Sequence, residues 1–168
     1  MITRGKAVAV LAYVAGVVDS DGHIGIDRSA TMPQRRKSVR YEATVTVTNT
    51  DRPLMDWLQS EFGGSIQQRK QDKPHHKLTY SWKLSELQAS AFCREILPYL
   101  RVKCRQANLL IELKEGWQGP PIRGQGARVA DSELARREAI YQRFKSLNDD
   151  RRPQRLIETA SRTDDVIV

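Results

Sequence analysis

An apolar run of residues 7–18, with no charged side chain, ends in Asp19-Ser20-Asp21-Gly22. A helix over this run would have no polar face, so we expect it to be buried on all sides. A carboxylate at a helix C-terminus is locally unfavourable, because the helix dipole is already negative there. A divalent cation, which prefers oxygen ligands, would relieve that repulsion. The run therefore predicts a buried helix with Asp21 in a metal site at its end.

The same run is too short to span a membrane as a helix. Because Arg4 and Lys6 precede it, a secretory signal peptide is an alternative, but that assignment would discard the helix carrying the acids. Cys93 and Cys104 are too few for a disulfide framework and indicate reduced thiols. We therefore expect an intracellular protein of the cytoplasm, nucleoid or an organelle interior, neither secreted nor membrane-bound.

The chain carries 28 Lys and Arg against 20 Asp and Glu in 168 residues, a net charge of +8. Such an excess indicates a polyanionic partner, nucleic acid above all, although a basic surface can also arise without one. The length fits one domain over residues 1–168, with a core at about 7–147 and a basic tail at 148–168.

The pattern of apolar residues predicts an α+β fold. Alternation predicts strands at 23–27, 41–48, 65–70 and 77–84, and helical spacing predicts helices at 50–62, 85–97, 102–113 and 131–147. This order gives an αββαββα core with a four-stranded antiparallel sheet, helices on one face, and extra C-terminal helices. The face under the helices would bury Ile24, Ile26, Ala43, Val45, Val47 and Ile66.

The opposite sheet face would be polar and flanked by basic loops. A sheet face of this kind can lie in the DNA major groove and contact base edges, whereas the alternative is an ordinary solvated face. On the fourth strand either Thr79, Ser81 and Lys83 or Tyr80 and Trp82 would face outward, and polarity favours the first set. The full set of expected DNA contacts is Gly25, Asp27, Arg28, Arg35, Arg36, Lys37, Arg40, Glu42, Thr44, Thr46, Ser65, Gln67, Arg69, Lys77, Thr79, Ser81, Lys83, Arg151 and Arg152.

Residues 14–22, Val-Ala-Gly-Val-Val-Asp-Ser-Asp-Gly, resemble the motif of LAGLIDADG homing endonucleases, with Val at the aliphatic positions. Residues 98–103, followed by Gln-Ala-Asn-Leu at 106–109, resemble the segment that carries the active-site lysine in the homodimeric, group I intron-encoded members. Residues 146–149 are similar to their C-terminal region, so the resemblance spans about residues 10–155. The chain is thus identified as a single-motif member, intron-encoded or free-standing rather than embedded in an intein.

The resemblance implies the roles of the site residues. Asp21 would bind the metal with help from the Ser20 carbonyl, and Lys103 would act near the attacking water. Asn49 and Arg52 would lie in the water network and beside the scissile phosphate, where the spacing is two residues shorter than the family pattern. Asp19 is expected to have a structural or capping role. The cofactor would be Mg²⁺ or Mn²⁺, with two or more ions shared across a dimer.

A single Asp per chain provides too few ligands for the metal site, because a two-metal phosphodiester hydrolysis needs ligands on both sides of the phosphate. A homodimer would bring two Asp21 side chains together. The apolar helix offers small residues for close contact over residues 9–18, and we expect Ala12, Ala15 and Gly16 in the interface. A homodimer would recognise a pseudo-palindromic DNA target.

The leading hypothesis is a site-specific endonuclease that cuts both DNA strands. The alternatives are a non-cleaving RNA-splicing maturase or DNA-binding regulator on the same fold, with intron RNA as a further partner. An unrelated basic RNA-binding domain would leave the Asp-Ser-Asp-Gly ending unexplained.

Overall fold

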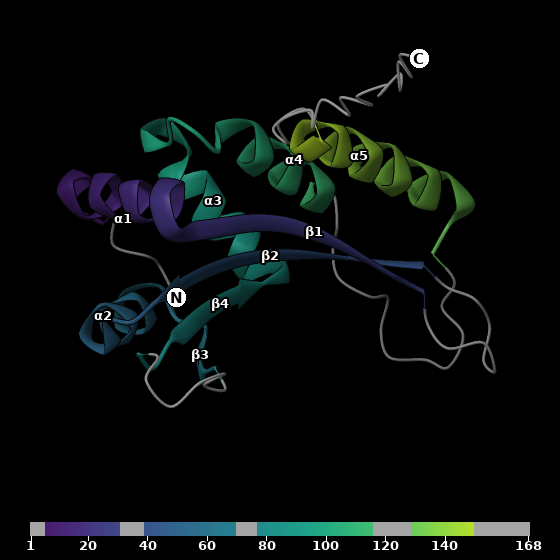
Figure 1. Ribbon diagram of the computed structural model, residues 1–168. Coiled ribbons are helices and arrows are strands. Elements are labelled where there is room, and N and C mark those ends of the chain that lie inside the picture. The colour runs from purple at the N-terminus through teal and green to yellow at the C-terminus, as the bar shows by residue number, and fades with distance from the viewer. Residues whose placement is uncertain (1–5, 31–38, 70–76, 116–128, 150–168) are drawn as a thin grey trace, which may run out of the picture.

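The computed structural model describes residues 6–30, 39–69, 77–115 and 129–149 (Figure 1). The elements follow the order that the sequence predicts and confirm the α+β class. They are α1 (Val8–Asp21), β1 (Gly22–Ala30), β2 (Val39–Asn49), α2 (Arg52–Phe62), β3 (Ser65–Gln68), β4 (Tyr80–Ser85), α3 (Glu86–Ile96), a 3-10 turn η1 (Leu97–Tyr99), α4 (Cys104–Lys114) and α5 (Asp131–Asp149).

The four strands form one antiparallel sheet in the order β1-β2-β4-β3. Strand β2 is central, because Val45 pairs with Ile24 of β1 and with Leu84 of β4. Strands β3 and β4 are each shorter than predicted, although the Arg69 amide still donates to the Thr79 carbonyl at 2.8 Å beyond the strand ends. The helices α1, α3, α4 and α5 lie on one face of this sheet (Figure 1).

The chain passes from α1 directly into β1, and Gly22 makes that transition possible. A Cβ atom at this position would lie 2.6 Å from the Val18 carbonyl oxygen and 2.7 Å from its Cα. Any other residue would therefore collide with the helix backbone. Because Gly22 then pairs with Val47, the end of α1 lies beside the last residues of β2.

The core fills the space between the sheet and its helices. Trp82, Met55, Leu58, Leu84 and Ile96 are among its largest fully buried side chains, and α5 adds residues 140 and 144. The prediction for the sheet is confirmed at five of its six apolar positions, while Ile66 on the edge strand β3 is only partly buried. Burial of this size is the main stabilising contribution to the fold.

The expectation that the first helix is buried on all sides is wrong for the single chain. Val14, Ala15 and Val18 are fully buried, but Val8 is 65% exposed and Tyr13 is 56% exposed. The core covers only one side of α1, so the other side presents apolar groups to solvent. No helix in the described ranges is both long and apolar enough to cross a membrane.

Candidate functional site

The end of α1 and the end of β2 bring Asp21 and Asn49 together. The Asn49 Nδ2 donates a hydrogen bond of 2.9 Å to the Asp21 Oδ2. The other side of the same amide, Asn49 Oδ1, accepts from the Asp51 backbone amide at 3.0 Å. Asn49 is thus held at both ends, and it orients a carboxylate that remains exposed to solvent.

Lys103 lies just before α4 and reaches back to the same end of α1. Its Nζ donates to the Val18 and Asp19 carbonyl oxygens, both at 2.7 Å. These carbonyls belong to the last turn of the helix, where a cation also interacts favourably with the helix dipole. The structure therefore places Lys103 at the expected end of α1, close to the residues that precede Asp21.

The carboxylate of Asp19 makes further hydrogen bonds between the end of α1 and the turn before α4. It accepts hydrogen bonds from the backbone amides of Arg101, Val102 and Lys103 at 2.7, 3.1 and 2.9 Å. The turn before α4 and the end of α1 are thereby joined in both directions. Asp19 has the capping geometry that we expected, and its two oxygens are occupied by the protein's own backbone.

The two other residues of the predicted centre have partners within the chain. The Ser20 hydroxyl donates to the Val17 carbonyl at 3.2 Å, so its side chain is hydrogen-bonded within α1. The Arg52 Nε lies 2.8 Å from the Asp56 Oδ1, and its guanidinium carbon lies 5.2 Å from the centre of the Tyr80 ring. These contacts fix Arg52 at the start of α2, three residues after Asn49.

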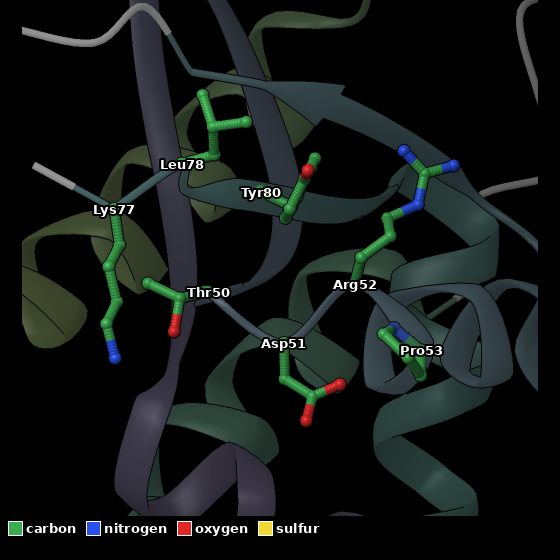
Figure 2. Close-up of a pocket in the computed structure, with 7 residues that line it drawn as sticks. All are labelled: Thr50, Asp51, Arg52, Pro53, Lys77, Leu78 and Tyr80. Carbon is green, nitrogen blue, oxygen red and sulfur yellow. The ribbon is translucent and has the colours of Figure 1, made fainter. Parts of the chain in front are cut away.

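Arg52 also lines an open depression of about 560 Å³, whose other lining residues are Thr50, Asp51, Pro53, Lys77, Leu78 and Tyr80. Figure 2 shows Lys77 and Arg52 flanking this depression, with Tyr80 between them. Asp51 caps α2, because its carboxylate accepts from the Leu54 amide at 2.9 Å. The depression therefore begins at the residue after Asn49, and Arg52 and Lys77 place two cationic side chains along it.

The donor set fits a hard divalent cation, but one chain supplies little of it. Asp21 offers an exposed, oriented carboxylate, the type of ligand that Mg²⁺ prefers. Within the described residues, no three His, Cys, Asp or Glu side chains are grouped so that they could hold a metal ion. The Cys93 thiol is not available as a nucleophile, because burial raises its pKa to about 12.

The sheet face opposite the helices carries most of the expected DNA-contacting residues. Trp82 and Leu84 are buried under the helices, which puts Ser81 and Lys83 on this open face and settles the alternative for the fourth strand. Open-face residues with exposed or half-exposed side chains are Asp27, Arg40, Glu42, Thr46, Ser65, Gln67, Ser81 and Lys83. Arg69, Lys77 and Thr79 lie beyond the strand ends at the same sheet edge.

Two of the expected base contacts are buried instead. Thr44 is 3% exposed, and its Oγ1 lies 3.5 Å from the Asp27 Oδ2. Gly25 is buried beside it, since a Cβ there would lie 2.7 Å from the His23 ring and 3.0 Å from Thr44. His23, which was not among the expected DNA contacts, is exposed opposite Thr46. Its spacing of two from Gly25 was the signal that it shares the open face.

Arg28 lies on the helix side of the sheet, not on the open face. It alternates with Ile24 and Ile26, and its Nε lies 3.1 Å from Glu138 of α5. Tyr41, paired with Arg28, also donates to Glu138, a contact that lowers the pKa of this carboxyl, while burial raises the pKa of the Tyr41 hydroxyl. This group joins α5 to the β1–β2 hairpin.

Arg40 is on the open face but is not a free cation. Its guanidinium lies 3.1 Å from Glu86, whose second oxygen binds the nearly buried Lys114. Glu86 has a φ of 54°, a left-handed conformation that a non-glycine residue seldom adopts. The five remaining expected contacts, Arg35, Arg36, Lys37, Arg151 and Arg152, lie outside the described residues.

The exposed side of α1 modifies the expected dimer interface. Ala12 and Gly16 are exposed, and a Cβ at Gly16 would meet no atom within 4 Å. Ala15, which we expected beside them, is fully buried against the protomer's own core and cannot contact a partner. The surface of α1 that remains for contact with a second copy is its exposed stripe. We define this exposed stripe of α1 as Val8, Ala9, Ala12, Tyr13 and Gly16.

The structure resembles several solved homing endonucleases. I-CvuI in complex with its target matches with a TM-score of 0.64 and 20% identity, over 84% of this chain and 83% of that one. Archaeal intron-encoded I-Vdi141I with DNA gives a TM-score of 0.63 and 18% identity, over 82% and 83%. I-SmaMI bound to cleaved DNA gives 0.58 and 14%, over 84% of this chain and 45% of that one.

At these identities the likeness establishes the fold. Among curated protein sequences there is no significant match. A family model described as LAGLIDADG endonuclease matches residues 14–106, which include the C-terminal part of α1, the whole sheet and Lys103. The chain belongs to the LAGLIDADG endonuclease family, with the single-motif homing endonuclease fold.

Proposed function

We propose that this protein is a site-specific double-strand DNA endonuclease that acts as a homodimer and uses a divalent metal. The observation that carries the proposal is the Asp21 carboxylate, oriented by Asn49 at 2.9 Å, at the end of a helix with an exposed apolar stripe. One oriented carboxylate is half of a two-metal site. The stripe gives the surface through which a second copy brings the other half.

The exposed stripe of α1 supports self-association. Val8 and Tyr13 expose large apolar side chains, and Ala12 and Gly16 between them allow two backbones to approach closely. If two α1 helices pack here in a parallel sense, their C-terminal Asp21 residues lie at the same end of the helix pair.

The open sheet face supports double-stranded DNA as the substrate. Its side chains are polar, and the whole chain has a net charge of +8. The solved relatives include I-CvuI with target DNA and Ca, I-CvuI with an uncleaved target in the presence of Mg, and I-Vdi141I with DNA. A dimer with two such faces would bind a target with two-fold symmetry.

The chain's own residues account for the rest of the chemistry. A bound divalent ion supplies charge neutralisation at the scissile phosphate and a more acidic water. Asn49 holds the Asp21 carboxylate in position, and Lys103 places an ammonium beside the last turn of α1. Arg52 and Lys77 at the depression provide cations for the phosphates that flank the scissile bond.

A selection from a random double-stranded DNA library, followed by incubation with Mg²⁺ or Mn²⁺, tests substrate and reaction together. We expect two-fold symmetric sites, cut in both strands. The variant Asp21→Asn should bind the selected sites and cut none of them. Binding without cutting by the unaltered protein would make it a DNA-binding regulator, and undiminished cutting by Asp21→Asn would refute the assigned centre.

The dimer is tested by a matched pair of substitutions. Ala12→Leu enlarges a side chain in the exposed stripe, whereas Ala91→Leu makes the same change at an exposed position of α3. We expect Ala12→Leu to shift the protein to monomers in sedimentation experiments and to abolish cutting, while Ala91→Leu stays dimeric. A monomeric unaltered protein that still cuts both strands would contradict the proposal.

A further inference from the structure

Near the middle of the open face, the carboxylate of Glu42 and the ammonium group of Lys83 form an ion pair. The Lys83 Nζ of β4 lies 3.6 Å from the Glu42 Oε1 of β2, and the two side chains are 46% and 34% exposed. Lys83 is opposite Thr46 in the register, so its side chain extends past the level of Thr44 to reach Glu42. The pair therefore lies over the centre of the sheet, between its two inner strands β2 and β4.

A carboxylate at this place works against general DNA affinity, because phosphates are repelled by it. Asp27 lies directly opposite Glu42 on β1, which adds like-charge repulsion between neighbouring strands. An exposed ion pair contributes little to folding stability. Neither stability nor general affinity therefore explains Glu42, whereas hydrogen bonding to a base does.

We infer that Glu42 and Lys83 together recognise one G·C base pair in the major groove of each half of the target. Lys83 donates to the O6 and N7 of guanine, and Glu42 accepts from the N4 amino group of cytosine. This inference rests on the proposed function, because it needs the open face to lie on double-stranded DNA.

The distance between the two side chains fits this base pair. Guanine O6 and cytosine N4 are hydrogen-bonded to each other, so they lie about 2.9 Å apart. A donor and an acceptor separated by 3.6 Å can thus face both atoms at once. When DNA binds, Lys83 and Glu42 give up their contact with each other, and each hydrogen-bonds to a base atom instead. Neither charged group is then left without a partner.

The same chemistry disfavours an A·T pair. Guanine presents two adjacent acceptors, N7 and O6, to a lysine, whereas thymine presents O4 alone, with its methyl group beside it. Glu42 could still accept from adenine N6, so Lys83 carries the larger share of the discrimination. In the proposed dimer each protomer contributes one pair, so the two preferred G·C pairs are related by the two-fold axis of the site.

The test is a binding selection without added metal, comparing the unaltered protein with Glu42→Gln and Asp27→Asn. Both variants lose one negative charge from the same face, so both should gain in general affinity. Glutamine can pair with adenine N6 and N7. Because Lys83 still favours guanine, we expect Glu42→Gln to relax one symmetric position of the selected site, so that T·A, with adenine on the side of residue 42, is selected beside G·C, while Asp27→Asn leaves that position as G·C.

A chemical substitution in the DNA provides a second measurement. Replacing that guanine by 7-deazaguanine should weaken binding of the unaltered protein about fivefold or more and should not weaken binding of Lys83→Met. If Glu42→Gln and Lys83→Met select the same sites as the unaltered protein, the inference is overturned while the proposed function stands. If the unaltered protein selects no DNA site, both are overturned.

Discussion

The Asn49 side chain donates a hydrogen bond to Asp21, 28 positions earlier in the chain, and its Oδ1 accepts one from the Asp51 backbone amide. The Asn49 side-chain amide therefore links the Asp21 carboxylate, at the end of α1, to the backbone that follows β2. Partners of this kind, one step removed from a metal, fix the orientation of the ligand.

Asn49→Ala should lower both metal affinity and cleavage by about 10–100-fold, because Asp21 loses its orienting partner. Calorimetric titration of Mg²⁺ or Ca²⁺ into the DNA complex separates the metal effect from the rate. Asn49→Asp provides the contrast, since a second carboxylate beside Asp21 should shift the pH profile of cleavage upward. Unchanged metal affinity in Asn49→Ala would remove Asn49 from the centre.

The two acids of the motif should differ in their effect on folding. Asp19→Ala removes the acceptor of three backbone amides and should lower the free energy of unfolding by about 2 kcal/mol. Asp21→Asn removes a negative charge from a helix C-terminus and should leave stability unchanged or slightly higher. Urea unfolding of the two variants measures both, and equal losses would contradict the division of roles.

The turn between α2 and β3 offers a matched pair of glycines. Gly63 and Gly64 have φ angles of 74° and 86°, but only Gly64 is crowded, with a Cβ position 2.6 Å from the Lys83 carbonyl oxygen. Gly63→Ala should cost about 2 kcal/mol through backbone strain alone, because φ 74° with ψ −150° is a conformation essentially restricted to glycine. Gly64→Ala adds a backbone collision and should cost more than Gly63→Ala. Thermal unfolding of both variants checks the order.

Glu133 pairs with Arg136 and Arg137 within α5, so the stability of this helix should depend on acid pH. Hydrogen bonds from Arg136, with a further one from Arg137, lower the pKa of Glu133 to about 2, against an ordinary value of 4.5. Because the folded pKa is lowered, the stabilisation is complete above pH 4.5 and disappears as the pH falls toward 2.

Glu133→Gln should therefore be less stable than the unaltered protein at pH 7, by up to about 1 kcal/mol because the pair is partly exposed. The two proteins should approach the same stability near pH 2. Urea unfolding across this range measures the difference. A constant gap at all pH values would show that Glu133 acts through packing rather than through its charge.

The sequence predicted the order of elements and the placement of Asp21, because each depends on neighbours in the chain. Period-two alternation likewise separated Lys83 from Trp82. The same rule puts Arg28 under the helices with Ile24 and Ile26, but we had assigned Arg28 by its charge. Its partner Glu138 is 110 positions away, and no local pattern identifies such a contact.

Two features lay beyond any local pattern. A helix that is apolar all round has no preferred side in the sequence, so nothing distinguished the buried Ala15 from the exposed Ala12. The strand order β1-β2-β4-β3 is also a property of the assembled sheet. It alone determines that Lys83 reaches Glu42 across the centre of the open face.

The exposed stripe of α1 has a consequence for the cell that carries this gene. If a complete site needs two copies, the amount of active enzyme at low expression varies with the square of the protein concentration. Halving the level of the chain would then reduce cutting about fourfold, by mass action. If the protein cuts DNA as proposed, its activity would therefore rise more steeply than its concentration while expression is low.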